Sequence, residues 1–282
     1  MEMPRVISTV GELRAAVSGW RRAGERVGLV PTMGALHSGH LSLVAAAQNS
    51  VDRVVVSIFV NPSQFAPHED FDRYPRNIDE DLRTLSQLEA PDLVFAPPVA
   101  ELYPRGFVTR IELNGPALGL ETDYRPHFFS GVATIVAKLL IAATPHIAVF
   151  GEKDYQQLLV VRRLARDLGL DAEILGAPIV REPDGLALSS RNAYLGIGER
   201  RVAGQLNGIL RAVAGNIRSG ASISDAEQSG RTSLLASGFD SVDYVAVRDA
   251  ETLEKLERPK GQMRALAAAT IGRTRLIDNI AV

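Results

Sequence analysis

The chain has 282 residues, 46% of them hydrophobic, with a net charge of −2 at pH 7 and no cysteine. A chain of this length forms one or two domains and can bury a sizeable core, and its charge balance provides no bulk attraction to nucleic acid or to an anionic membrane. The lack of cysteine excludes disulfides, thiol nucleophiles and cysteine metal sites. Because MEMPRVISTV at the N-terminus has no signal-peptide pattern, and no apolar run approaches the roughly 18–20 residues of a membrane span, we expect a soluble, cytoplasmic protein.

Short apolar strands alternate with helices in the first part of the chain. The segments RVGLV, RVVVSIFV, DLVFA, IAVFG and DAEIL predict strands at 26–30, 53–60, 92–96, 147–151 and 171–175. Helical periodicity predicts helices that begin at 41, span 78–88, begin at 131 and span 154–169. This alternation is typical of a parallel sheet covered by helices on both faces. We therefore place a Rossmann-like α/β domain of the nucleotide-binding type at residues 1–178.

The rest of the chain has a different pattern. Apolar residues from Val202 to Ile217 recur on one helical face, and a second helix is expected at 224–237. VDYVAVRD then predicts a strand, and residues 263–279 predict two strands with a turn at Gly272–Arg273. We therefore expect a smaller α+β domain over residues 179–282.

The segment VPTMGALHSGH places two of the five histidines in one loop between a strand and a helix. A helix N-terminus has unpaired N–H groups and a partial positive charge, which favour phosphate, and residues i and i+3 share a helical face. His37 and His40 can therefore address the same phosphates and donate to charge on a leaving group. Two ordinary polar loop histidines are the alternative. A zinc pair is a third interpretation, which no HExxH pattern or cysteine supports.

Three further segments carry polar groups suited to ligands. FGEKDYQQ follows a strand at the end where α/β sheets bind ligands, so Lys153 can meet phosphate, and Asp154 can bind a ribose hydroxyl or only cap the helix. DGLALSSRN, at 184–192, combines two hydroxyls with an arginine, either as an anion-binding loop or as a plain interdomain connection. NPSQF carries Asn61 and Gln64, whose neutral amides suit carboxylates and hydroxyls. Each segment is weak by itself, but together they favour one site.

Taken together, these segments resemble the pantothenate synthetase (pantoate–β-alanine ligase) family of the HxGH nucleotidyltransferase superfamily. The resemblance runs through PTMGALHSGH, VVVSIFVNPSQF, YPR, GEKDYQQL, DGLALSSRN and TRLIDNI, and it covers nearly the whole chain. It implies an enzyme that condenses (R)-pantoate with β-alanine to pantothenate, using ATP and Mg²⁺ and releasing AMP and pyrophosphate through a pantoyl-adenylate. It also implies a homodimer formed through the first domain.

The resemblance further implies roles for particular residues. His40 would be the acid catalyst, with His37, Lys153 and Arg191 as further catalytic groups on the phosphates. The ATP site would comprise Met33, Gly34, Ala35, Leu36, His37, Ser38, Gly39, His40, Gly151, Glu152, Lys153, Asp154, Val180, Leu188, Ser189, Ser190 and Arg191. The residues assigned to pantoate and β-alanine would be Gln64, Gln157, Asn61 and Tyr74. Asp81 is the candidate magnesium ligand, although a solvated helix face shared with Glu80 explains it equally well.

Two positions depart from the family pattern. Ser38 stands where the family usually has an acidic residue, which removes a charge near the phosphates. The family's RPGHF is RPHFF at 125–129, so Phe128 occupies the histidine position. Whether a local shift lets His127 replace that contact is left open by the sequence.

Three other functions and one motion complete the expectations. NPSQF and TRLIDN argue against another HxGH adenylyltransferase, and the presence of His37, His40, Lys153 and Arg191 argues against a non-catalytic nucleotide sensor. A tRNA-linked enzyme is disfavoured because no domain is basic. GAPIVREPDG places two glycines and two prolines at the domain junction. We therefore expect the second domain to be a lid hinged near 176–180, with a rigid two-domain block as the alternative.

Overall fold

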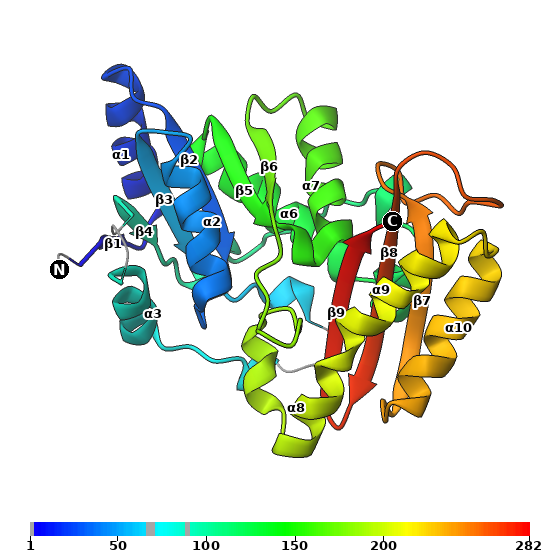
Figure 1. Cartoon of the computed structure of the whole chain (residues 1–282). Coiled ribbons are helices and arrows are strands. Elements are labelled where there is room, and N and C mark those ends of the chain that lie inside the picture. Colours follow the sequence, from blue (N-terminus) through cyan, green and yellow to red (C-terminus); the bar gives the residue numbers. More distant parts are fainter. Residues whose placement is uncertain (1–2, 66–70, 88–90) are drawn as a thin grey trace.

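The computed structural model describes residues 3–65, 71–87 and 91–282. Figure 1 shows two parts side by side, a larger sheet with its helices and a smaller sheet with its own. The strands of the larger sheet are β1 (Arg5–Ile7), β2 (Val27–Thr32), β3 (Arg53–Ile58), β4 (Leu93–Phe95), β5 (Ile147–Gly151) and β6 (Glu173–Ala177). The helices of this part are α1 (Val10–Arg22), α2 (Ser38–Gln48), α3 (Ile78–Leu85), α4 (Val99–Leu102), α5 (Glu121–Tyr124), α6 (Phe128–Ala143) and α7 (Tyr155–Asp167).

The larger sheet is parallel throughout, in the order β1-β4-β3-β2-β5-β6. Successive side chains of a strand point to opposite faces, and both faces of this sheet are buried. On β2, Leu29 belongs to the apolar cluster that includes α1, α6 and α7, whereas Val30 belongs to the cluster that includes α2 and α3. The predicted Rossmann-like parallel sheet, covered on both faces, is confirmed.

The smaller part contains α8 (Ile197–Ala203), α9 (Gln205–Arg218), α10 (Ile223–Ala236), β7 (Ser241–Asp249), β8 (Met263–Ile271) and β9 (Thr274–Ala281). Its three strands form an antiparallel sheet in the order β7-β8-β9, and apolar residues of α9 and α10 pack with that sheet in one core. Gly272 provides the left-handed backbone of the β8–β9 turn, with φ of +56°. The predicted α+β architecture is confirmed, and the division at residue 178 stays a prediction.

Several elements differ from those expected from the sequence. The predictions omitted β1, α1, α4, α5 and α8. The apolar face expected from Val202 to Ile217 is divided between α8 and α9 at Gly204, whose hydrogen side chain lies against the Asp184 carboxylate that pairs with Arg200. The expected helix at 78–88 ends at Leu85, and its predicted last residue, Leu88, lies outside the described residues.

A small apolar cluster joins the two parts. Leu120 and Leu159 from the larger part pack with Ala246, Leu253 and Leu266 from the smaller part. The parts therefore share a contact surface in addition to the chain that connects them. Among residues 3–65, 71–87 and 91–282, no helix combines the length and apolarity that a membrane crossing requires.

Candidate active site

A cavity of about 860 Å³ lies between the carboxyl ends of the parallel strands and the smaller sheet. Strands β3, β2 and β5 are neighbours, so the segments that follow them meet at one edge of the sheet. The predicted site residues that line the cavity are Met33, His37, Gly39, His40, Asn61, Gln64, Tyr74, Gly151, Lys153, Asp154, Gln157, Val180, Leu188, Ser189, Ser190 and Arg191. The predicted residues that do not line it are Gly34, Ala35, Leu36, Ser38, Asp81 and Glu152.

The two histidine rings lie in contact, tilted by 43° to each other, at the N-terminus of α2. Their ring centroids lie 4.1 Å apart. The backbone N–H of His37 donates to Nδ1 of His40 at 3.3 Å, and the N–H of Gly39 donates to Nδ1 of His37 at 3.1 Å. A ring nitrogen that accepts a hydrogen bond carries no proton, so each neutral imidazole carries its proton on Nε2. Both rings are therefore oriented to donate from Nε2.

The pKa values of both histidines are strongly lowered. Burial, and then the positive charge of Lys153, lower the pKa of His37 to about 4. Burial, followed by the charges of His37 and Lys153, lowers the pKa of His40 to about 3. Both imidazoles are consequently neutral hydrogen-bond donors at neutral pH rather than cations.

These pKa values predict an acid-sensitive fold. Imidazoles of the unfolded chain take up protons near 6.5, whereas the folded values are about 4 and about 3, so stability falls as the pH drops through this interval. Urea unfolding at about pH 7.5 and about pH 5 measures the loss. We expect a smaller loss on acidification in the double variant His37→Gln/His40→Gln than in the unaltered protein. The exposed His127, replaced by glutamine, is the control, and equal losses in all three proteins would contradict the prediction.

Asp81 lies beneath the loop that precedes the histidines. Its carboxylate accepts the N–H of Leu36 at 2.8 Å and the N–H of Ala35 at 3.2 Å, and Asp81 is only 3% exposed. Ala35 has φ of +51°, and a Cβ on Gly34 would lie 2.8 Å from Oδ2 of Asp81. Burial raises the pKa of Asp81, although the two N–H bonds oppose this effect. The solvated helix face, which was the alternative to a magnesium ligand, is therefore wrong for Asp81: the carboxylate is buried and stabilises a left-handed loop.

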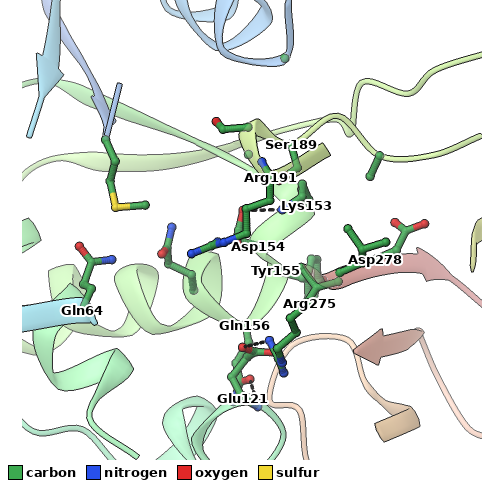
Figure 2. Close-up of a pocket in the computed structure, with 18 of the residues that line it drawn as sticks. Gln64, Glu121, Lys153, Asp154, Tyr155, Gln156, Ser189, Arg191, Arg275 and Asp278 are labelled. Atoms are coloured by element: carbon green, nitrogen blue, oxygen red, sulfur yellow. Dashed lines mark hydrogen bonds and ion pairs between the residues drawn. The ribbon is translucent and has the colours of Figure 1, made fainter. Parts of the chain in front are cut away.

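Lys153 and Asp154 lie at the end of β5, where α7 begins. The Lys153 Nζ is 3.7 Å from Oδ2 of Asp154, and Figure 2 shows both side chains close to Ser189 and Arg191. Asp154 occupies the N-cap position of α7, but its side chain makes no capping hydrogen bond. Capping of α7 was one of the two roles that the sequence left open for Asp154. Its carboxylate does not cap the helix and faces the cavity instead.

The serines of the LSSRN segment connect the two parts of the molecule. Ser190 Oγ donates to the backbone carbonyl of Ala35 at 3.1 Å, which ties the segment to the histidine loop. Ser189 is the N-cap of a 3₁₀ helix (Ser190–Tyr194), where its Oγ accepts the N–H of Arg191 at 3.3 Å. Arg191 is thereby held on the cavity wall, close to Lys153.

The amide end of the cavity is built around Asn61. Asn61 is 1% exposed, and its Nδ2 donates to Oε1 of Gln64 at 2.9 Å and to the carbonyl of Gly131 at 3.1 Å. Its Oδ1 accepts from the hydroxyl of Tyr103 at 2.8 Å. Asn61 therefore holds Gln64 in place, and among residues 3–65, 71–87 and 91–282 no partner occupies the Nε2 of Gln64. Tyr74 is buried and packs edge-on against Phe65.

Phe128 occupies the cavity wall where the family pattern has histidine. The guanidinium of Arg125 lies 4.0 Å above its ring, and Nη2 of Arg125 donates to the backbone carbonyl of Gln64 at 3.2 Å. His127 is exposed and borders a separate, smaller hollow with Ser63. His127 therefore does not take the place of the family histidine in this structure.

A buried ion-pair network at the other end of the cavity escaped the sequence-based predictions. The two carboxylate oxygens of Glu121 accept Nη1 and Nη2 of Arg275 at 2.8 Å each, and the hydroxyl of Tyr244 donates to Glu121 at 2.7 Å. Nε of Arg275 also donates to Asp243 at 2.7 Å. Burial raises the pKa of Glu121, but the hydrogen bonds and charges of its partners outweigh burial, so the net pKa is lowered. Figure 2 shows this pair apart from Lys153.

The parallel sheet, the neutral histidine pair at a helix N-terminus and the neighbouring lysine and arginine define an HxGH-type nucleotidyltransferase fold and site. A family description, pantoate–β-alanine ligase, matches residues 5–281. The chain belongs to the pantoate–β-alanine ligase family.

Individual relatives agree over the full length. A pantothenate synthetase from Mesorhizobium japonicum is 55% identical over 100% of this chain and 99% of the relative, and one from Caulobacter vibrioides is 53% identical over 100% of both. The solved pantothenate synthetase from Thermus thermophilus has 47% identity and a TM-score of 0.91 over 98% of each chain. A pantoate–β-alanine ligase from Francisella tularensis, solved with β,γ-ATP and β-alanine, has 33% identity and a TM-score of 0.82, over 98% of this chain and 97% of that one.

Proposed function

We propose that this chain joins (R)-pantoate to β-alanine at the expense of ATP, through a pantoyl-adenylate, with release of pyrophosphate and then AMP. The observation that carries the proposal is one cavity that holds His37, His40, Lys153 and Arg191 together with the amide of Gln64. Membership of the pantoate–β-alanine ligase family supports the reaction. The ATP-type ligand and β-alanine bound to the Francisella tularensis relative support the choice of substrates.

The chemistry needs no protein nucleophile. A carboxylate oxygen of pantoate attacks the α-phosphorus of ATP, and the bond to pyrophosphate breaks. Lys153 and Arg191 neutralise phosphate charge, while His40 donates from Nε2 to the oxygen on which charge develops. The β-alanine ammonium first loses a proton to solvent. Its amine then attacks the carbonyl carbon of the anhydride, the bond between that carbon and the phosphate oxygen breaks, and the nitrogen gives a second proton to solvent as AMP leaves. The protein contributes by positioning the reactants and stabilising charge.

Magnesium is proposed as the ion that accompanies ATP, because Mg²⁺ is usually held by substrate phosphates and one or two carboxylates. Asp81 fits poorly as such a carboxylate, since its oxygens accept the N–H groups of Ala35 and Leu36 and it does not border the cavity. Within the described ranges, no cluster of three or more His, Cys, Asp or Glu residues could hold a metal ion. Neutralisation of phosphate charge is what magnesium supplies when bound.

The decisive test is isotope exchange between pyrophosphate and ATP. We expect exchange that depends on pantoate and does not need β-alanine, because the adenylate forms first. With both substrates present, mass spectrometry should detect pantothenate and AMP. Absence of pantoate-dependent exchange would contradict the adenylate route. If the chain were an adenylyltransferase of another kind, it would release no AMP. Its match to the pantoate–β-alanine ligase family would then be unexplained.

Gln64 is expected to govern substrate affinity more than rate. Replacing it with alanine removes the amide held by Asn61 and leaves polar partners unpaired, at about 1–3 kcal/mol each. The KM values for pantoate and β-alanine should rise, whereas the KM for ATP should change little. Steady-state kinetics of Gln64→Ala measures this, with the exposed Gln262, replaced by alanine, as the control. A rise confined to the KM for ATP would contradict the placement.

The smaller domain, residues 179–282, is proposed as a lid hinged near 176–180. In the structure, Ser190 contacts the histidine loop at Ala35. Opening at the hinge would break this contact. Closure would restore it, complete the phosphate contacts and exclude water from the reactive anhydride. We expect the radius of gyration in small-angle scattering to fall when a non-hydrolysable ATP analogue and pantoate bind. Unchanged scattering together with unchanged hydrogen exchange across 176–195 would support a rigid two-domain block instead.

The remaining expectations concern assembly and location. We propose a homodimer formed through the first domain, and a cytoplasmic enzyme whose partners are small-molecule substrates. The even charge balance supports the lack of a nucleic-acid partner. Sedimentation of the purified protein tests the dimer.

A further inference from the structure

The TRLIDNI segment forms most of β9, and its Asn279 contacts the turn that carries Lys153. Nδ2 of Asn279 donates to the backbone carbonyls of Glu152 and Lys153, at 2.9 Å each. Asn279 is 2% exposed and 126 residues distant from Lys153 in the chain. One side-chain amide of the smaller part thus holds two successive carbonyls of the larger part.

The orientation of the Asn279 amide is determined by its other contacts. Its Oδ1 accepts Nε of Arg264 at 2.7 Å, so its Nδ2 must face the two carbonyls. Arg264 also donates to the carboxylate of Glu152 at 3.0 Å and lies 4.1 Å above the ring of Tyr155. The backbone N–H of Asn279 donates to Oδ1 of Asp278 at 2.7 Å. Although Asn279 borders the cavity, both N–H groups of its side chain donate to the backbone carbonyls of Glu152 and Lys153.

The Glu152–Asp154 turn needs the support of Asn279 because it is a short turn at the cavity. Residues Glu152–Asp154 form a single 3₁₀ turn between β5 and α7, and none of the three is buried. The Lys153 side chain extends from this turn into the cavity. A small rotation of the backbone at residues 152 and 153 would displace the ammonium at its tip, because the side chain is long. An amide is suited to prevent this, since its two hydrogens engage two carbonyls at once.

We propose that Asn279 is a positioning residue, which acts through the Glu152–Lys153 backbone to place the Lys153 ammonium on the phosphates of ATP. This role rests on the proposed ATP-dependent function. Misplacement of a catalytic group by about 1 Å can cost up to 10²-fold in rate. We therefore expect Asn279→Ala to lower the rate of adenylate formation by about 10–100-fold. We also expect weaker binding of a non-hydrolysable ATP analogue and unchanged binding of pantoate.

The experiment is a double-mutant cycle between Asn279→Ala and Lys153→Ala, using single-turnover rates and calorimetric binding of the ATP analogue. If Asn279 acts through Lys153, its replacement should have little further effect once Lys153 is alanine. Additive losses would overturn the proposal. Binding of the ATP analogue is measured without turnover, so the two proposals can fail separately. If the unaltered protein binds the analogue but forms no adenylate, the proposed function is refuted and the positioning role of Asn279 is not.

A matched control separates positioning from stability. Asn207 is also 2% exposed, and its Nδ2 donates to the other oxygen of Asp278 at 3.1 Å, with no hydrogen bond to the Lys153 turn. Asn207→Ala should lower stability while leaving analogue binding unchanged. Asn279→Asp provides a second variant of the same size in which an acceptor faces the two carbonyls, and it should behave as Asn279→Ala does. An equal loss of analogue binding in Asn207→Ala, or normal binding in Asn279→Asp, would overturn the proposal.

Discussion

Replacing His40 with alanine is expected to slow formation of the adenylate by about 10²–10³-fold, the typical cost of removing one preorganised donor. The His37 N–H holds Nδ1 of His40, so its Nε2 proton is oriented before any substrate binds. The pKa of His40 is lowered to about 3 by burial and by the neighbouring His37 and Lys153, so the ring is neutral and donates with its single proton on Nε2. Quenched-flow measurement of a single turnover reports this step directly.

The control for this variant is His127→Ala, because His127 is exposed and borders a different hollow. It should retain the single-turnover rate of the unaltered protein. Circular dichroism and thermal unfolding of His40→Ala should show a folded protein. A near-normal rate of adenylate formation in His40→Ala would rule out its assignment as the donor that stabilises the developing charge.

Replacing Glu121 with alanine should cause the largest loss of stability, roughly 3–5 kcal/mol in the free energy of unfolding. The loss arises because Arg275 stays partly buried after its bidentate partner is gone, and Asp243 is left as its ion-pair partner. Because the folded pKa of Glu121 is lowered, the stability it contributes is present above the ordinary carboxylate range and is lost as the pH falls through the folded value. Urea unfolding at neutral pH measures the loss.

The exposed pair of Arg163 and Asp167 on α7 is the comparison, and Asp167→Ala should change stability by no more than about 1 kcal/mol. Replacing Glu121 and Arg275 together with leucine should recover part of the loss, because the bidentate pair is then removed as a whole and only the Asp243 carboxylate loses its Arg275 partner. The explanation by a stranded charge would be wrong if the double variant were less stable than Glu121→Ala.

The part of the site that could be predicted from the sequence is the part that follows parallel strands. Segments such as VPTMGALHSGH and FGEKDYQQ each begin at the end of an apolar strand, and parallel strands bring such ends to one edge. His37, Lys153 and Gln64 therefore meet in the cavity as the pattern indicated. The helix α1 was missed although it had a local signal, since Thr9 and Glu12 form a capping box ahead of the buried Leu13.

Contacts between segments that are distant in the chain have no comparable signal in the sequence. Glu121 and Arg275 are 154 residues apart, and neither lies in a pattern that specifies its partner. A solvated helix face was the alternative for Asp81 because charged residues precede it on α3, whereas its carboxylate accepts the backbone N–H of Leu36. Only the path of the chain in three dimensions brings these groups together.

The contacts made by β9 have a consequence for how the enzyme becomes functional during folding. Through Asn279 and Arg275, β9 reaches back 126 and 154 residues to the turn at Lys153 and to Glu121. Contacts at such separations close large loops, which is slow in comparison with forming helices and adjacent strands. The helices and the antiparallel pairs β7–β8 and β8–β9 can therefore form while the nucleotide site is still imprecise. Competence to bind ATP should be acquired late, after most of the secondary structure has formed.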